Sequence, residues 1–243
     1  MSETAEELKQ AVRAAIEQAV RTDLQRLRLA LELQPEGQLL IDGEVDDIGI
    51  KRRLVRAAKS VTDIQGVVDR TRILPIEARG DGELLNGVYG AITGEPAFRE
   101  HAVAAEDGGP DAARYSGHQD AEGVVEVLVK NGVATLVGNV PSLTHRRLAE
   151  VLAWWTSGIV DVDNHLHVVP PEDDSDDEIT DAVRIVLEKD PWLDASQIAV
   201  HTKASKVILN GLLHSAEQRH MAECNAWYVS GVLDVENRIE VRT

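Results

Sequence analysis

A duplicated segment is the feature that most constrains how this chain folds. Residues 138–168 align with residues 211–241 without a gap, and 13 of the 31 paired positions are identical. The matched stretches include the phrases AWWTSGIVDVDN and AWYVSGVLDVEN, each with two adjacent aromatic residues. A repeat of this length indicates a duplicated structural unit rather than one large domain.

The repeat extends upstream and predicts three units. EPAF at 95–98 matches DPWL at 190–193 at a spacing of 95 residues instead of 73, which implies about 22 extra residues in the middle unit. We place them at about 104–123, a Gly, Ala and Asp-rich run in which we expect a mobile loop. A more diverged copy, with a helix segment three residues longer, begins near Ile41. The predicted domains are residues 1–75, 76–170 and 171–243.

Each unit has the pattern of a helix, two strands, a second helix and a last strand. Residues 179–187 have helical spacing, and the two predicted strands of the middle unit flank a turn at Asn131-Gly132. Ser215 and Gln218 have the spacing of a capping box that begins the second helix. We therefore expect an α+β fold of three tandem small domains, each with a three-stranded sheet covered by two helices.

These segments resemble the BON (bacterial OsmY and nodulation) domain family, whose pattern is an NGxVxLxG hairpin, a helix with spaced alanines, and then GVxxVxN. NGVATLVG, RRLAEVLAWWTSGIVDVDNHLHV and RHMAECNAWYVSGVLDVENRIEV fit that pattern. The first unit fits it loosely, because its turn is PEG and a residue near Arg70 stands where the others carry Asn164 and Asn237. The resemblance implies a bacterial binding module, in several cases for anionic phospholipid and often under osmotic stress. Some relatives contribute to potassium sensing or to chaperone-like protection.

Charge and composition exclude several classes of protein. The formal net charge is -17, with 12 basic against 13 acidic residues in 1–75, 6 against 14 in 76–170, and 7 against 15 in 171–243. So acidic a chain repels polyanions, and we expect no nucleic-acid partner. The N-terminal segment lacks an export signal, no apolar run approaches the roughly 20 residues that span a bilayer, and Cys224 is the only cysteine. We expect a cytoplasmic monomer, whose lipid contacts would be with the inner face of the membrane.

The second helix of the two similar units carries candidate contact residues. On a helical wheel, a core side gathers around Leu148 and Trp155, and the side chains of Arg146, Glu150 and Trp154 lie opposite. The third unit repeats these outer residues as Arg219, Glu223 and Trp227, and its Tyr228 is expected to face inward like Trp155. An outward tryptophan beside an Arg–Glu pair is more than the fold needs and predicts a contact surface. Packing between units and plain exposure are the alternatives.

The first unit has a basic helix face in place of this tryptophan. Lys51, Arg52, Arg56 and Lys59 lie on one side of its second helix. Such a face is either simply solvated or attracted to anionic headgroups, at on the order of 1 kcal/mol per basic residue.

The remaining candidate residues are expected to have structural roles or none. Trp192 is expected to close the core of the third unit, and Cys224 to be a buried thiol. His165 and His167 share a strand face with two aspartates, a spacing that is common by accident. No hydrolase, phosphate-loop, HExxH or CxxC motif is present. We therefore expect no enzyme activity, no cofactor and no resident metal.

Three hypotheses for function follow from the sequence. The leading one is a non-enzymatic, stress-associated binding protein that docks on anionic phospholipid or on a membrane-associated protein through its outer helix faces. The second is an osmotic-response protein whose backbone carbonyls bind potassium. The third is a scaffold or chaperone-like holdase that uses its units together.

Overall fold

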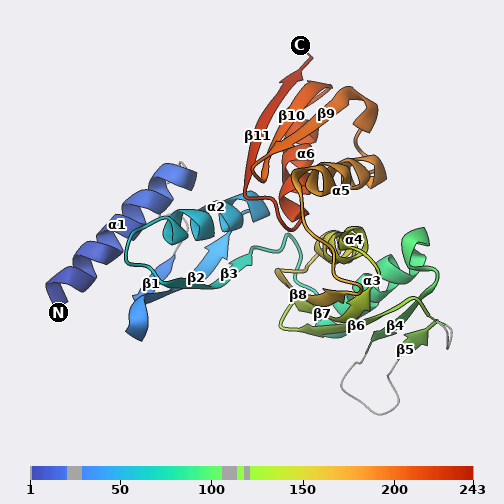
Figure 1. Ribbon diagram of the computed structural model, residues 1–243, viewed down its shortest axis with the longest axis horizontal. Helices are drawn as coiled ribbons and strands as arrows, with labels where there is room; N and C mark the ends of the chain where they lie inside the picture. The colour runs from blue at the N-terminus through green and yellow to red at the C-terminus, as the bar shows by residue number, and fades with distance from the viewer. Residues whose placement is uncertain (1, 21–28, 106–113, 118–120, 243) are drawn as a thin grey trace. The chain divides into compact units, whose positions relative to one another are not determined.

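The protein is α+β, and the order helix, strand, strand, helix, strand recurs three times along it, with two further strands inserted after the first helix of the second domain (Figure 1). The computed structural model describes residues 2–20, 29–105, 114–117 and 121–242. The chain divides into two compact units, residues 1–74 and residues 75–243. The first unit holds one small domain, and the second holds two domains that pack against each other.

The first domain consists of α1 (Ser2–Val20), β1 (Ala30–Leu33), β2 (Gln38–Val45), α2 (Ile48–Lys59) and β3 (Gly66–Ile73). Its sheet has the order β1-β2-β3, with β1 antiparallel and β3 parallel to the central strand. Both helices cover one face of this sheet (Figure 1). Val12 and Ile16 of α1 pack there with Leu39 and Ile41 of β2 and Leu54 of α2, all of them inaccessible to solvent.

The second domain contains α3 (Asp81–Gly94), β6 (Gly123–Lys130), β7 (Val133–Val140), α4 (Leu143–Trp154) and β8 (Asp161–Val168). Strands β6 and β7 form the predicted hairpin. Asn131 and Gly132 have φ values of 52° and 76°, as a type I′ turn requires. In each domain the last strand begins 28 residues after the start of its parallel partner, so the first domain does not have the longer helix segment that we expected.

The sheet of the second domain has five strands instead of the predicted three, in the order β5-β4-β6-β7-β8. The extra strands are β4 (His101–Ala105) and β5 (Arg114–Ser116), and β4 pairs in parallel with β6. The predicted loop at 104–123 is therefore wrong for residues 104–105, 114–116 and 123, while residues 106–113 and 118–120 lie outside the described residues. The small apolar side chains of β4 are buried, which allows this strand to extend the sheet.

The third domain contains α5 (Asp176–Lys189), β9 (Ile198–Lys203), β10 (Lys206–Leu213), α6 (Ala216–Tyr228) and β11 (Asp234–Val241). Ser215 caps α6 as predicted, because its Oγ accepts a hydrogen bond from the Gln218 backbone N–H at 3.2 Å. The glycine repeated at 138 and 211 is explained by a lack of space for a side chain. A Cβ on Gly211 would lie 2.1 Å from the carbonyl oxygen of Gln197, just before β9, and a Cβ on Gly138 of the second domain would lie 2.1 Å from that of Val124 in β6.

Helix α4 has neighbours on most of its sides. It packs on β7 and β8 of its own domain, on α3, and on α5 and α6 of the third domain (Figure 1). Its residues from Arg147 to Trp154 are consequently all buried. Among the described helices, none has both the length and the apolar character that crossing a bilayer requires.

Candidate functional site

The two tryptophans predicted to face outward are buried. Trp154 is 7% exposed and Trp227 is 1% exposed, whereas Trp155 and Tyr228, predicted to face inward, are half-buried. The Trp154 ring stacks on Tyr228 of the third domain at a centroid distance of 5.8 Å. The predicted contact surface is therefore wrong in these tryptophans. For Trp154 the alternative of packing between units holds, because the side of α4 that faces away from its own sheet is covered by the next domain.

Arg146 and Glu150, also predicted as contact residues, belong to a network inside the second domain. The Asn164 side-chain amide donates to the Arg146 carbonyl at 3.0 Å and to a Glu150 carboxylate oxygen at 3.1 Å. Arg146 Nε donates to the Leu166 carbonyl at 3.0 Å, and the Leu166 N–H donates to Asn164 Oδ1 at 3.1 Å. These bonds fasten α4 to β8, which is a structural role.

The third domain repeats this network between α6 and β11. Asn237 Nδ2 donates to the Arg219 carbonyl at 2.8 Å and to Glu223 Oε2 at 3.3 Å. Arg219 Nη2 donates to the Asn237 carbonyl at 3.3 Å. Thus the identities at Arg, Glu and Asn that mark the repeat are accounted for by the fastening of a helix to the last strand.

The first domain builds the same connection from different residues. Lys51, at the position of Arg146, is 6% exposed and donates to the Thr71 carbonyl at 2.6 Å. Its Nζ also pairs with Asp69 at 2.9 Å. Asp69 is the fourth residue of β3, as Asn164 is of β8, so Asp69 and not Arg70 answers the repeated asparagine. Lys51 therefore has to be removed from the predicted basic face.

The first domain carries Asp69 where the second carries Asn164, and a second difference nearby explains why this aspartate is tolerated. Val55 stands at the position of Glu150, so no carboxylate faces Asp69 there. Asn164→Asp should therefore destabilise the second domain by about 1–3 kcal/mol, since it removes a donor and sets a carboxylate against the buried Glu150. Adding Glu150→Val should recover part of that loss in urea unfolding.

The third domain supplies the matched control for this cycle. Glu223 is half-buried, and its bond from Asn237 is longer, so Asn237→Asp should cost less than Asn164→Asp. Additive losses in the double variant Asn164→Asp with Glu150→Val would contradict the proposed repulsion.

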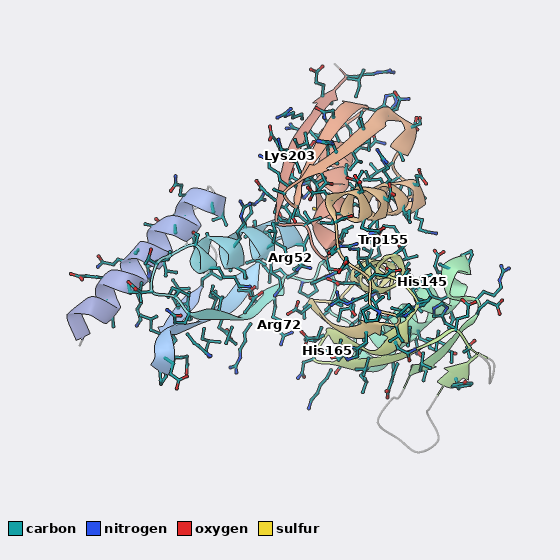
Figure 2. All side chains as sticks on the ribbon, viewed as in Figure 1. Arg52, Arg72, His145, Trp155, His165 and Lys203 are labelled. Atoms are coloured by element: carbon teal, nitrogen blue, oxygen red, sulfur yellow. The ribbon has the colours of Figure 1, made fainter. Side chains whose placement is uncertain are left out.

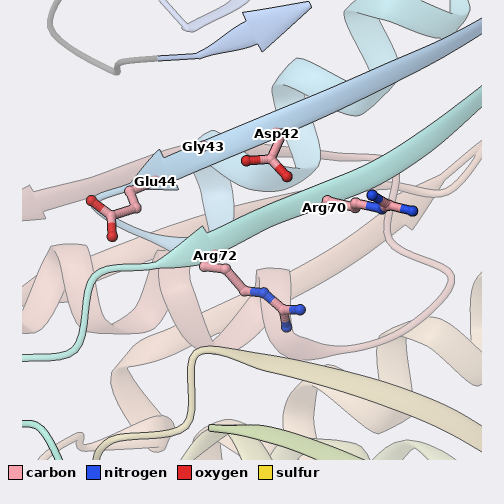
Figure 3. A pocket seen from close by; sticks show the side chains of 5 residues that line it. All are labelled: Asp42, Gly43, Glu44, Arg70 and Arg72. Atoms are coloured by element: carbon pink, nitrogen blue, oxygen red, sulfur yellow. The ribbon is translucent and has the colours of Figure 1, made fainter. Parts of the chain in front are cut away.

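The rest of the basic face lies at the exposed end of α2. Arg56 and Lys59 are exposed in the last turn of the helix, and Arg52, one turn earlier, is half-buried (Figure 2). On the face of the same sheet opposite α1 and α2, a groove of about 420 Å³ is lined by Asp42, Gly43, Glu44, Arg70 and Arg72 (Figure 3). Its acids and arginines stand opposite each other in register, so the lining carries no net charge to select a charged ligand.

The joint between the second and third domains is held by Arg147. This side chain is 2% exposed, and its Nη2 donates to both carboxylate oxygens of Asp174 at 2.6 Å. Its Nε donates to the Ser230 carbonyl of the third domain at 2.8 Å. At Gly231 a Cβ would lie 2.9 Å from Arg147 Nη2, so the glycine leaves room for the guanidinium. The sequence reasoning missed this residue, since its third-domain counterpart is His220.

A second set of contacts joins the two domains through an asparagine. Trp155 Nε1 donates to Asn225 Oδ1 at 3.0 Å, and Asn225 Nδ2 donates to Asp190 Oδ2 at 2.6 Å. These three residues border a cleft of about 400 Å³ between the domains. We call it the aromatic cleft, and its lining residues are Trp154, Trp155, Asp190, Pro191, Trp192, Met221, Cys224, Asn225 and Tyr228.

Two expectations about residues of the aromatic cleft are wrong. Trp192 does not close the core of the third domain but is 72% exposed, because the adjacent Leu193 occupies the position of the buried Phe98 of the second domain. Cys224 is half-buried rather than buried. It lies 3.5 Å from His220 Nε2.

A buried histidine lies at the start of β4. His101 is 2% exposed, its ring stacks on His145 at a centroid distance of 5.0 Å, and Phe98 packs edge-on against it at 5.1 Å. Burial, together with the nearby His145, lowers the pKa of His101 below its ordinary value of 6.5. The ring is therefore neutral at neutral pH and serves the packing of the extended sheet.

No metal centre is found among the residues that the structure describes, since no group of three or more His, Cys, Asp or Glu side chains converges there. His165 and His167 are both exposed on β8. On β11, which offers acids in their place, Glu236 pairs with Lys206 at 2.7 Å and with Arg238 at 2.6 Å. These two cations lower the pKa of Glu236 to about 2.

Comparison with known proteins identifies the repeated domain. Two solved chains of CdsD, a structural protein of the type III secretion system of Chlamydia trachomatis, are similar to this chain at 13% identity and a TM-score of 0.25. One of them is described as the C-terminal domain of CdsD. They cover 95% and 94% of this chain, and 96% and 91% of their own lengths, but so low a TM-score supports no functional conclusion. No curated protein matches the chain.

The BON domain model matches residues 115–170 and 175–243, two segments rather than the three that we expected. These matches hold both copies of the Arg–Glu–Asn network and the joint between them. The chain therefore belongs to the BON domain family.

Proposed function

We propose that this protein is a non-enzymatic, stress-associated binding protein that docks weakly on anionic phospholipid through the end of α2 in its first domain. The observation that carries the proposal is the exposed pair Arg56 and Lys59, with Arg52 one turn earlier on the same side of the helix. The membership of the BON family supports a binding role, and no contact is proposed for Trp154, Trp227 or the two Arg–Glu pairs.

We also propose that the first domain is a diverged BON domain, although the family model does not match it. Its elements follow the same order with the same spacing between the parallel strands. The contacts that fasten the second helix to the last strand also have counterparts here. Lys51 takes the place of the repeated arginine, Asp69 takes the place of the repeated asparagine, and Thr71 takes the place of the residue two positions after that asparagine.

The expected binding is weak and depends on salt. Three basic side chains near an anionic surface contribute about 3 kcal/mol together, or roughly 100-fold in partitioning. The other two predicted domains carry 13 basic against 29 acidic residues, from the 6 and 7 against 14 and 15 counted above, and the membrane repels them. The Debye length falls from about 30 Å at 0.01 M salt to about 8 Å at physiological ionic strength, so recovery on vesicles should drop over that range.

Vesicle flotation tests this proposal. The recovery of the full chain with phosphatidylglycerol vesicles should exceed its recovery with phosphatidylcholine vesicles at low salt, and physiological ionic strength should remove this difference. The triple change Arg52→Gln, Arg56→Gln and Lys59→Gln should abolish most of the recovery. The control loses the same charge from the third domain, where three exposed residues are replaced by glutamine: Arg184, Lys203 and Arg238. This control should still float with the vesicles. Equal recovery of both variants would refute a role for α2.

A further inference from the structure

The aromatic cleft contains a buried carboxylate that has no cationic partner in the protein. Asp190 is 7% exposed. Its oxygens accept hydrogen bonds only from neutral donors, the Asn225 side-chain amide at 2.6 Å and the Trp192 backbone N–H at 2.9 Å. Within the described part of the chain, no Lys, Arg or His pairs with it. A buried carboxylate without a counter-charge is costly, so this site favours the arrival of a cation.

The duplicated position in the second domain shows what kind of partner such an acid accepts. Glu95 is the counterpart of Asp190, and it likewise accepts a hydrogen bond from the backbone N–H two residues later, that of Ala97, at 3.2 Å. Its carboxylate pairs with the ammonium group of Lys189 at 2.8 Å. The chain thus supplies an ammonium group to one copy of the acid and none to the other.

The walls of the aromatic cleft are suited to an organic cation rather than to a metal ion. Trp155, Trp192 and Tyr228 line it, and the Trp192 segment is held against α6 because its carbonyl accepts from Gln218 Nε2 at 2.9 Å. Aromatic faces attract alkylated ammonium groups, with Trp the most effective ring. The volume of about 400 Å³ lies in the range of small-molecule sites.

We propose that the aromatic cleft binds a trimethylammonium group, with Asp190 as counter-charge and the rings of Trp155, Trp192 and Tyr228 in contact with its methyl groups. The fold does not require Trp192 to be an exposed tryptophan, since Ala97 occupies the same place in the second domain. The site uses none of the residues at the basic end of α2, so the two proposals stand or fall independently. A free solute and a phosphatidylcholine headgroup both present this chemistry.

Tryptophan fluorescence of the full chain with choline as the probe tests the site, since three of its four tryptophans line the cleft. Choline should change the emission in a saturable way. Trp192→Ala should weaken its affinity about fivefold to tenfold, and Trp192→Phe should weaken it less, because a ring remains. Tyr115→Ala, which removes another exposed aromatic ring, on β5, should leave the affinity unchanged.

Two further probes can overturn the proposal. The uncharged tert-butyl analogue of choline should bind much more weakly, and equal affinity would show that the positive charge is not recognised. Potassium or sodium chloride at the same ionic strength should not reproduce the emission change. Absence of saturable binding by choline, or an unchanged affinity in Trp192→Ala, would refute the site.

Two arms separate the sources of the group. Saturation by free choline without flotation on phosphatidylcholine vesicles assigns a soluble ligand, whereas flotation with those vesicles that Trp192→Ala abolishes assigns a lipid headgroup. Asp190→Asn would not test the counter-charge alone. Its side-chain NH₂ group, if placed against the Asn225 amide, would disturb the joint between the domains.

Discussion

Replacing Trp227 with alanine should destabilise the second compact unit by about 3–5 kcal/mol, the range for removing a large buried aromatic side chain. Trp227 is 1% exposed on α6 and is the largest fully buried side chain among the described residues. Its removal leaves a buried cavity, whose cost adds to the transfer free energy of the lost indole. Urea unfolding followed by far-UV circular dichroism measures the loss.

Trp192→Ala is the matched control for Trp227→Ala. It deletes the same atoms from a side chain that is 72% exposed, so its effect on unfolding should stay within about 0.5 kcal/mol. A mild effect of Trp227→Ala, with a stability close to that of the control, would mean that the Trp227 indole is not a core residue.

The second large effect is expected from Arg147→Ala, at about 2–4 kcal/mol. The change removes two hydrogen bonds to Asp174 and one to the Ser230 carbonyl, together with the packing of a side chain that is 2% exposed. Asp174 is 45% exposed in its side chain and can be rehydrated, so the ion pair itself contributes only part of this loss. We expect a lower melting temperature and faster proteolysis of the segment between the domains.

Arg184→Ala provides the comparison for Arg147→Ala. Arg184 also pairs with an aspartate, Asp181 at 3.1 Å, but on the surface of α5, and its loss should cost no more than about 1 kcal/mol. If the two variants melt at the same temperature, Arg147 does not hold the joint between the second and third domains.

The local structure was predictable because it depends on neighbours in the chain. Asn131-Gly132 adopts the left-handed conformations of a tight hairpin, and Ser215 caps the helix that follows it. The alternation of strands and helices and the α+β class follow from the same short-range patterns. The short strand β4 was missed, since its five residues, HAVAA, stand beside a Gly and Asp-rich run that is typical of loops.

The candidate site was predictable only in part, because its geometry depends on residues far apart in the chain. A helical wheel treats α4 as covered on one side, but the third domain covers the other, so Trp154 is buried and Arg147 becomes a joint residue. Likewise, Lys51 shares the basic pattern of α2 but turns toward Asp69, 18 residues later.

The sequence by itself therefore determined the BON-type repeat, the order of its elements, their caps and turns, and the acidic character of the chain. The tertiary structure alone decided which repeated residues are buried, and it showed that the Arg, Glu and Asn identities fasten a helix to a strand. It also decided that Glu95 has an ammonium partner and Asp190 has none. The physical reason is that burial and charge compensation depend on distances between domains, which local sequence patterns do not specify.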